Sequence, residues 1–250
     1  MLILEIDAGN SRIKWRILDT ESKSVKVLDR GFAPATQQDD LPQEFMDALL
    51  NFQPLKLDQI RVSNVRGNAF ADALQTFCRQ ALGLDVGFAR VVDKLNGINS
   101  SYAEPGAMGV DRWLAMQGAY ARNPSASCIV DCGSAITVDL LDAKGRHEGG
   151  FIVPGLQLMQ QSLQSGTASL PYESVASYRD EPGVNTLEAI QHGALNMALG
   201  LLERVRQRWA EDKTWYFCGG DAELLVPLIR WEYILEPDLV FDGLAVVCGN

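Results

Sequence analysis

The strongest constraint on the fold is a pattern that occurs twice, once around Asp7 and once around Asp131. In each copy an apolar run ends in Asp-x-Gly, and a second run of alternating or apolar residues follows. The first copy covers residues 2–18 and the second covers residues 128–141. Glycine permits a tight turn, and short runs of this kind are typical of strands. Each copy therefore predicts a strand, an acidic turn and a second strand.

The segments that follow the two copies also correspond. A polar turn, at residues 20–23 and at residues 142–146, precedes a third expected strand at residues 25–32 and at residues 147–153. This order predicts an α/β chain of two duplicated ribonuclease-H-like domains of the actin-like ATPase type, with mixed five-stranded sheets flanked by helices. The expected domains are residues 1–115 and 116–250. The alternative is that two such turns arose in unrelated hairpins, where they are common.

Helical and strand periodicity alternate in the rest of each half. We expect helices at residues 41–52, 68–82, 156–164, 186–210, 222–229 and 242–248, and strands at residues 59–65, 86–91, 214–218 and 233–235.

Composition excludes several classes of function. The net charge of -10, without a dense run of Lys or Arg, disfavours nucleic-acid binding, which depends on neutralising phosphates. No apolar run is long enough to span a bilayer, and the first residues do not resemble a signal peptide. The five cysteines form no C-x-x-C pair, so a zinc site has weak support and free thiols in a reducing compartment are expected. We therefore expect a cytoplasmic protein with no nucleic-acid or membrane partner.

Phosphate binding must come from the two acidic turns, because the chain has neither a P-loop nor a G-x-G-x-x-G motif. Asp7 could hold a hydrated magnesium ion, since Mg²⁺ takes one or two carboxylates and keeps several waters. Asn10 and Ser11 offer backbone N–H groups to phosphate oxygens, and Lys14 adds a positive charge. Asp7 could instead be a plain turn former, and Lys14 could belong to a solvated strand face. In the second turn, Ser134 occupies the position that Asn10 occupies in the first turn.

Five segments resemble, in order, the motifs of type III pantothenate kinases. These are Asp7-Ala8-Gly9-Asn10-Ser11-Arg12-Ile13-Lys14, Gly109-Val110-Asp111-Arg112, residues 131–137, residues 149–155 and Cys218-Gly219-Gly220. The resemblance covers essentially the whole chain. Ser134 stands where the family usually has threonine, and no motif is evident in residues 52–88.

The resemblance implies ATP-dependent phosphorylation of pantothenate to 4′-phosphopantothenate, the first step of coenzyme A biosynthesis. It implies that Asp111 is the catalytic base and that Arg112 pairs with the pantothenate carboxylate. Without the resemblance, Asp111-Arg112 would read as the start of a helix, and Thr186 as a helix cap. The implied substrate-binding residues are Tyr102, Gly109, Val110, Asp111, Arg112 and Thr186. The implied ATP-binding residues are Asp7, Ala8, Gly9, Asn10, Ser11, Arg12, Ile13, Lys14, Ser134, Gly219 and Gly220.

The resemblance also implies cations and a homodimer. ATP would bind with magnesium, held through water by Asp7, and Asp131 would bind a monovalent cation, potassium or ammonium. The second halves of two subunits would pair, and the apolar stripe of the helix at residues 186–210 could join that interface or could be ordinary core. Two other functions stay open: another small-molecule kinase of the same superfamily, and a non-catalytic accessory regulatory relative.

Overall fold

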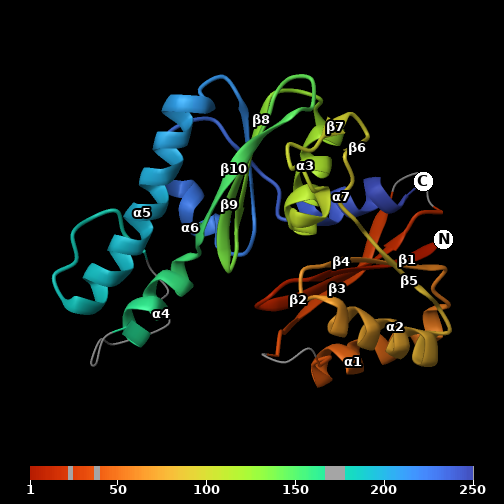
Figure 1. The fold of residues 1–250 in the computed structure, drawn as a ribbon. Helices are drawn as coiled ribbons and strands as arrows, with labels where there is room; N and C mark the ends of the chain where they lie inside the picture. Colours follow the sequence, from red (N-terminus) through yellow and green to blue (C-terminus); the bar gives the residue numbers. More distant parts are fainter. Residues whose placement is uncertain (22–24, 37–39, 167–177, 250) are drawn as a thin grey trace. The chain divides into compact units, whose positions relative to one another are not determined.

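The computed structural model describes residues 1–21, 25–36, 40–166 and 178–249. The chain forms two compact units, each with its own five-stranded sheet (Figure 1). Unit 1 comprises residues 1–96, 102–121 and 239–250, and unit 2 comprises residues 97–101 and 122–238.

The sheet of unit 1 has the order β3-β2-β1-β4-β5. Its strands are β1 (Leu2–Ala8), β2 (Arg12–Asp19), β3 (Lys26–Pro34), β4 (Gln59–Asn64) and β5 (Val86–Phe88). The helices are α1 (Gln43–Leu50), α2 (Asn68–Leu82), α3 (Val110–Arg122) and α7 (Leu239–Cys248), with 3₁₀ turns η1 (Gln53–Leu55) and η2 (Pro105–Ala107). β1 to β3 form an antiparallel meander, whereas β4 runs parallel to β1 and to β5.

The two faces of this sheet differ in polarity because side chains alternate along each strand. One face is apolar, and its residues Leu4, Ile6 and Trp15 pack with Phe45 of α1 and Phe70 of α2 in one core cluster. Figure 1 shows α1 and α2 on this side of the sheet and α7 on the other. The opposite face of the central strands therefore remains available for polar residues.

A buried charge cluster occupies part of that polar face. Glu5 accepts a hydrogen bond from Arg16 Nε at 2.8 Å and lies 3.4 Å from Arg61 Nη1, and Arg16 lies 3.6 Å from Asp242 of α7. Burial raises the pKa of Glu5, although both arginines lower it. A buried carboxylate needs such partners. The cluster thereby ties α7 to β1 and β2.

The helices α3 and α7 approach each other closely in unit 1. A Cβ atom on Gly118 would lie 3.0 Å from the backbone nitrogen of Gly243, and one on Gly243 would overlap the carbonyl of Leu114. The predicted domains, residues 1–115 and 116–250, stay a prediction. The two compact units reflect contacts between residues and not sequence halves, and α7 belongs to the unit of the first sheet.

The sheet of unit 2 repeats the topology, with the order β10-β9-β8-β11-β12. Its strands are β8 (Ser127–Cys132), β9 (Ala135–Leu141), β10 (His147–Pro154), β11 (Thr214–Cys218) and β12 (Ile234–Leu235). The helices are α4 (Leu156–Gly166), α5 (Thr186–Trp209) and α6 (Ala222–Leu225), followed by the 3₁₀ turn η3 (Val226–Leu228). Short strands β6 (Lys94–Leu95) and β7 (Ile98–Asn99) lie in the connecting segment. The predicted fold class, α/β with two mixed five-stranded sheets and flanking helices, is confirmed.

Several predicted elements begin or end elsewhere in the structure; the helix expected at residues 41–52, for example, is Gln43–Leu50. The helix expected at residues 222–229 ends early, since Pro227 cannot donate the backbone hydrogen bond that would continue it. The terminal helix starts three residues earlier than residue 242, at Leu239. The strand expected at residues 86–91 is only Val86–Phe88. Part of the polar turn expected at residues 20–23 lies outside the described residues.

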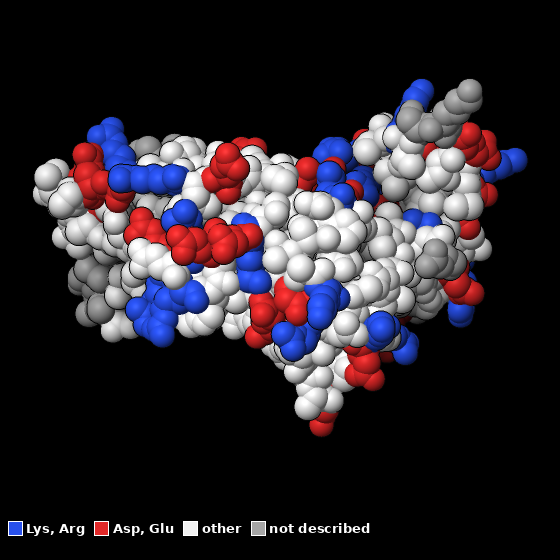
Figure 2. Space-filling model, turned by 90° about the horizontal axis from the view of Figure 1, so that it is seen from above, with Lys and Arg blue, Asp and Glu red and all other residues white. Residues whose placement is uncertain are grey.

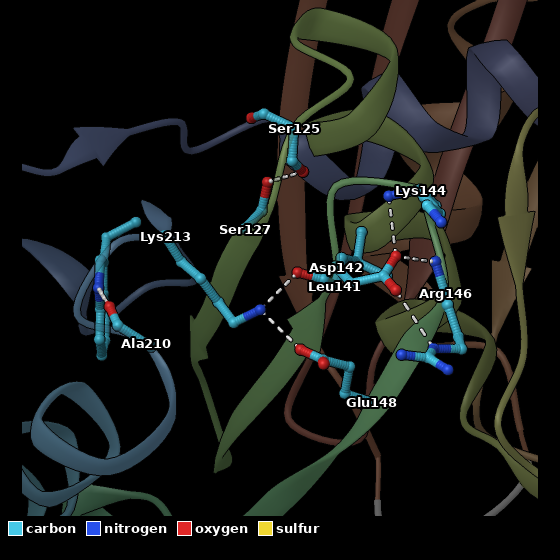
Figure 3. Close-up of polar contacts among 10 residues, drawn as sticks. Ser125, Ser127, Leu141, Asp142, Lys144, Arg146, Glu148, Ala210 and Lys213 are labelled. Atoms are coloured by element: carbon cyan, nitrogen blue, oxygen red, sulfur yellow. Dashed lines mark hydrogen bonds and ion pairs between the residues drawn. The ribbon is translucent and has the colours of Figure 1, made fainter.

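The corresponding turn of unit 2 is well defined (Figure 3). Asp142 Oδ1 accepts hydrogen bonds from the backbone N–H groups of Lys144 and Arg146, both at 2.8 Å, and Arg146 Nε lies 3.2 Å from Asp142 Oδ2. The bond from Arg146 N–H is the largest influence that holds the pKa of Asp142 below its usual value. Beside this turn, Lys213 Nζ donates to Leu141 O at 2.8 Å and to Glu148 at 2.6 Å.

Candidate active site

The first acidic turn joins β1 to β2 in unit 1. Gly9 N–H donates to Arg12 O at 3.1 Å, which closes the turn. A Cβ atom on Gly9 would lie 3.0 Å from that same carbonyl oxygen, so the turn favours glycine. Asn10 and Ser11 are exposed at its tip, whereas the side chains of Ala8 and Ile13 belong to the apolar core. A ligand at this turn would therefore meet the backbone of Ala8 and Ile13 and not their side chains.

Asp7 lies on the polar face at the carboxyl end of β1. It is opposite Lys14 in the antiparallel register and opposite Ser63 of β4 in the parallel register. Burial raises the pKa of Asp7, Lys14 lowers it, and the negative charge of Asp111 raises it. Ser63 Oγ is buried and makes no hydrogen bond of ordinary geometry, although its weak polar interaction with Asp7 lowers that pKa. The surroundings favour a cation beside Asp7.

The Gly109–Arg112 motif begins α3 in the same unit. Asp111 Oδ1 accepts a hydrogen bond from the N–H of Arg112 at 2.8 Å. A Cβ atom on Gly109 would lie only 2.6 Å from Asp111 Oδ1, so a side chain at residue 109 would displace the carboxylate. Val110 is buried and is part of the packing of α3.

Arg112 and Tyr102 form a second polar pair next to this motif. The Arg112 side chain is 5% exposed, and its Nη1 donates to Tyr102 Oη at 2.9 Å. The guanidinium carbon also lies 5.8 Å from the centre of the Tyr102 ring, in a cation–π contact. Since Arg112 uses the Tyr102 oxygen as an acceptor, the tyrosine hydroxyl proton can be donated elsewhere.

The second acidic turn joins β8 to β9 in unit 2. Gly133 N–H donates to Ala135 O at 3.0 Å, as Gly9 does to Arg12 in the first turn. Asp131 lies opposite Thr137 in the antiparallel register. Gly219 has a φ of +88°, and a Cβ atom there would overlap Asp131 Oδ1 and the backbone of Cys132. The structure thus places Gly219 against Asp131. Ser134, three residues after Asp131, and Gly220, directly after Gly219, are exposed.

Thr186 is exposed and is the first residue of α5 in unit 2. Its interpretation as a helix cap is wrong, because the cap is Asn185, whose side chain accepts from Glu188 N–H at 2.9 Å. Thr186 belongs to unit 2, whereas Tyr102 and Arg112, which are also expected to bind substrate, belong to unit 1.

Sequence patterns assigned no site role to three residues that contact the acidic turns. Ser63 lies beside Asp7, and strand pairing would have been needed to find it. Arg66 donates to the carbonyls of the first turn from a region without a recognised motif. Gly155 donates its N–H to Ser134 O at 2.9 Å, and a Cβ atom there would overlap Gly133 O. Gly155 ends the glycine-rich segment at residues 149–155, which was a usable signal.

Residues 1–21, 25–36, 40–166 and 178–249 contain no group of three or more His, Cys, Asp or Glu residues that could hold a metal ion. Both histidines have structural partners in unit 2: His147 Nε2 lies 3.0 Å from Asp139 Oδ1, and His192 Nδ1 lies 2.7 Å from Glu181 O. A hydrated magnesium ion needs only one or two carboxylates, so Asp7 with its raised pKa and the unsatisfied Ser63 Oγ fit such an ion.

Charged side chains of both signs lie on the surface of the protein. Figure 2 shows Lys and Arg side chains interspersed with Asp and Glu over the face it presents. Within the part of the chain that the structure describes, no helix is long and apolar enough to cross a membrane.

The repeated sheet topology, with an acidic turn after the first strand of each sheet, defines a duplicated α/β fold with two mixed five-stranded sheets. The chain belongs to the type III pantothenate kinase family, whose sequence profile matches residues 3–208. The type III pantothenate kinase of Pseudomonas fluorescens is 36% identical over 255 residues, which cover 99% of each chain.

Solved structures show the same fold at lower identity. A Baf-family protein from Campylobacter jejuni, described as a transcriptional activator, has a TM-score of 0.60 and 21% identity, with 100% of this chain and 98% of that chain covered. The activator of 2-hydroxyisocaproyl-CoA dehydratase from Clostridium difficile, with bound ADPNP, has a TM-score of 0.52 and 12% identity, with 99% and 93% covered.

Proposed function

We propose that this chain transfers the γ-phosphoryl group of ATP to pantothenate and forms 4′-phosphopantothenate. The observation that carries the proposal is the placement of Asp111 in unit 1, where Arg112 N–H orients its carboxylate and its charge contributes to the raised pKa of Asp7. It brings a candidate base into the neighbourhood of a candidate phosphate turn. Phosphoryl transfer requires this arrangement, since it depends on positioning and on charge stabilisation.

Asp111 acts as the general base in this proposal. It accepts the proton of the substrate hydroxyl as that oxygen bonds to phosphorus. The hydrogen bond from Arg112 N–H to Asp111 Oδ1 orients the carboxylate, and Gly109 leaves room for it. The proton acceptor is thereby fixed before the substrate binds.

Arg112 and Tyr102 bind the pantothenate carboxylate. A buried guanidinium pairs well with a carboxylate, because its N–H groups form a fork that matches the two oxygens. Arg112 is buried, with 5% of its surface exposed, and already donates to Tyr102 Oη, so the two side chains are placed together for such an anion. Gly109, Val110 and Thr186 complete the proposed substrate-binding set.

ATP binds through the two acidic turns. In the first turn, the N–H groups of Asn10 and Ser11 and the charge of Lys14 bind phosphate oxygens. Asp7 holds magnesium through water, and the ion would neutralise charge on the phosphates. In the second turn Ser134 binds phosphate, and Asp131 binds potassium or ammonium. Gly219 and Gly220 contact the adenosine.

We also propose a cytoplasmic homodimer. All five cysteines are free, and four of them are buried, which suits a reducing compartment. On α5, Met197 is 68% exposed, and Cβ atoms on Gly193 and Gly200 would meet nothing within 4 Å. An exposed methionine between glycines lets another helix approach closely, so α5 is the proposed contact between subunits.

A coupled assay of ADP release tests the proposal. The protein should release ADP from MgATP with pantothenate but not with a panel of sugars and small acids, and potassium or ammonium should stimulate it more than sodium. Phosphorylation of a sugar in place of pantothenate would indicate another kinase of the superfamily. Retained ATP binding without turnover of any substrate would indicate an accessory regulatory protein.

A further inference from the structure

Arg66 lies behind the first acidic turn, in the segment that follows β4. Its Nη1 donates to two consecutive carbonyls of the turn, Gly9 O at 3.4 Å and Asn10 O at 3.5 Å. Its Nη2 donates to Thr36 O at 2.9 Å. One guanidinium therefore links the turn to the chain that leaves β3.

The position of this guanidinium determines which way the turn presents its peptide groups. In a trans peptide the C=O and the following N–H point in opposite directions. Since the carbonyls of Gly9 and Asn10 point toward Arg66, the N–H groups of Asn10 and Ser11 point away from it. Two successive N–H groups aimed to one side form a concave site for an anion.

Arg66 is itself held by local contacts. Its N–H donates to Asn64 Oδ1 at 2.9 Å, and Asn64 Nδ2 donates to Gly67 O at 2.9 Å. Its guanidinium carbon lies 5.0 Å from the centre of the Phe70 ring in α2. Ala35, the neighbour of Thr36 in the chain, donates its N–H to Ser11 O at 3.0 Å. Arg66 is thus fixed by contacts with Asn64 of β4 and Phe70 of α2, and the turn is held by both Arg66 and Ala35.

We propose that Arg66 is a positioning residue that orients the first acidic turn for the phosphates of ATP. Arg66 donates hydrogen bonds to the two carbonyls and fixes their direction, so that the N–H groups of Asn10 and Ser11 face the phosphates. Its charge on the far side of the turn adds to the attraction for an anion. This inference rests on the proposed use of that turn for ATP and concerns a residue outside the motifs of the resemblance.

Binding of ATP, ADP and adenosine, measured by calorimetry with magnesium and without pantothenate, tests this inference. Arg66→Ala should weaken ATP and ADP about tenfold or more, the scale of one lost charged hydrogen bond, and leave adenosine affinity unchanged. Arg66→Lys keeps the charge but not the fork, so it should lose most of the same affinity. Arg79→Ala, which removes an exposed pair with Asp85, is the control and should change neither.

Three results would overturn the role of Arg66: unchanged ATP affinity in Arg66→Ala, an equal loss for adenosine and ATP, or a fully functional Arg66→Lys. If Arg66→Ala does not fold, the comparison between Arg66→Lys and wild type decides the question. A wild-type protein that binds ATP but does not phosphorylate pantothenate would contradict the proposed function and leave the role of Arg66 intact.

Discussion

The carboxylate of Asp111, at the start of α3, lies close enough to Asp7, at the end of β1, to raise its pKa. Burial is the largest cause of the raised pKa of Asp7, and Lys14 offsets only part of the effect. Two carboxylates kept close together in a folded protein are costly unless a cation or a proton is shared between them. This pair therefore indicates a site arranged for positively charged ligands and proton transfer.

Replacing Asp7 by asparagine should raise the stability of the protein and lower its activity. The pKa of Asp7 is raised in the folded protein, so its ionised form opposes folding at neutral pH, and the opposition disappears as pH falls through the raised pKa. Asp7→Asn should therefore raise the melting temperature at pH 7 and lower kcat by about 10²-fold or more. Thermal unfolding at pH 7 and pH 4 provides the check: the gain should shrink at pH 4. A lower melting temperature at pH 7 would contradict this assignment.

A side chain at residue 109 should displace Asp111. In Gly109→Ala the new methyl group would lie 2.6 Å from Asp111 Oδ1, and the carboxylate can move away at little cost in stability. We expect kcat to fall by as much as about 10²-fold, the effect of a misplaced catalytic group, with little change in melting temperature. Gly106→Ala is the matched control, because a Cβ atom there meets nothing within 4 Å. Equal activity of the two variants would show that the placement of Asp111 is not critical.

Residue 219 tests the second acidic turn in a similar way. Alanine at residue 219 adopts an unfavourable φ of +88° and overlaps Asp131 and the backbone of Cys132. Gly149→Ala shares the unfavourable conformation, with φ at +111°, but meets nothing within 4 Å. Both variants should lose about 1–2 kcal/mol from the conformation alone. Only Gly219→Ala should also lose ATP affinity and stimulation by monovalent cations, measured by titration calorimetry and steady-state kinetics.

The effect of Asp142, in the hairpin turn of unit 2, on the stability of the protein should depend on pH in the opposite direction to the effect of Asp7. Asp142 has a lowered pKa in the folded protein, so its stabilising effect is present above the unperturbed value of 3.8 and is lost as pH falls below it. Asp142→Ala should therefore destabilise the protein by about 1 kcal/mol at pH 7 and by less near pH 3. Urea unfolding at the two pH values measures this, with the exposed Glu211→Gln as control. A difference that grows at low pH would contradict the assignment.

The acidic turns were predictable because their signals are local. An apolar run that ends in Asp-x-Gly and continues as a second strand specifies the strand ends by itself, and both turns form as expected around Gly9 and Gly133. The third strand, the order of elements and the duplicated topology followed from the same alternation. The start of α5 at Thr186 was predicted correctly, but the alternative that made Thr186 the cap was wrong by one residue, since Asn185 and Thr186 are both good caps.

Long-range contacts were not predictable from such patterns. The position of Arg66 behind the first turn depends on the parallel pairing of β1 with β4, which local periodicity does not specify. The packing of α7 on α3 through Gly118 and Gly243 likewise joins distant segments. The proximity of Asp7 and Asp111 was expected only through the resemblance to a known family.

Mass-spectrometric measurement of 4′-phosphopantothenate formed from pantothenate and MgATP tests the central claim most directly. The wild-type protein should form one phosphopantothenate for each ADP released. Asp111→Asn should lower kcat by about 10²–10⁴-fold, as loss of a general base does, and keep the wild-type melting temperature and ATP affinity within error or with a small gain. No phosphopantothenate from the wild-type protein, or wild-type kcat in Asp111→Asn, would contradict this account.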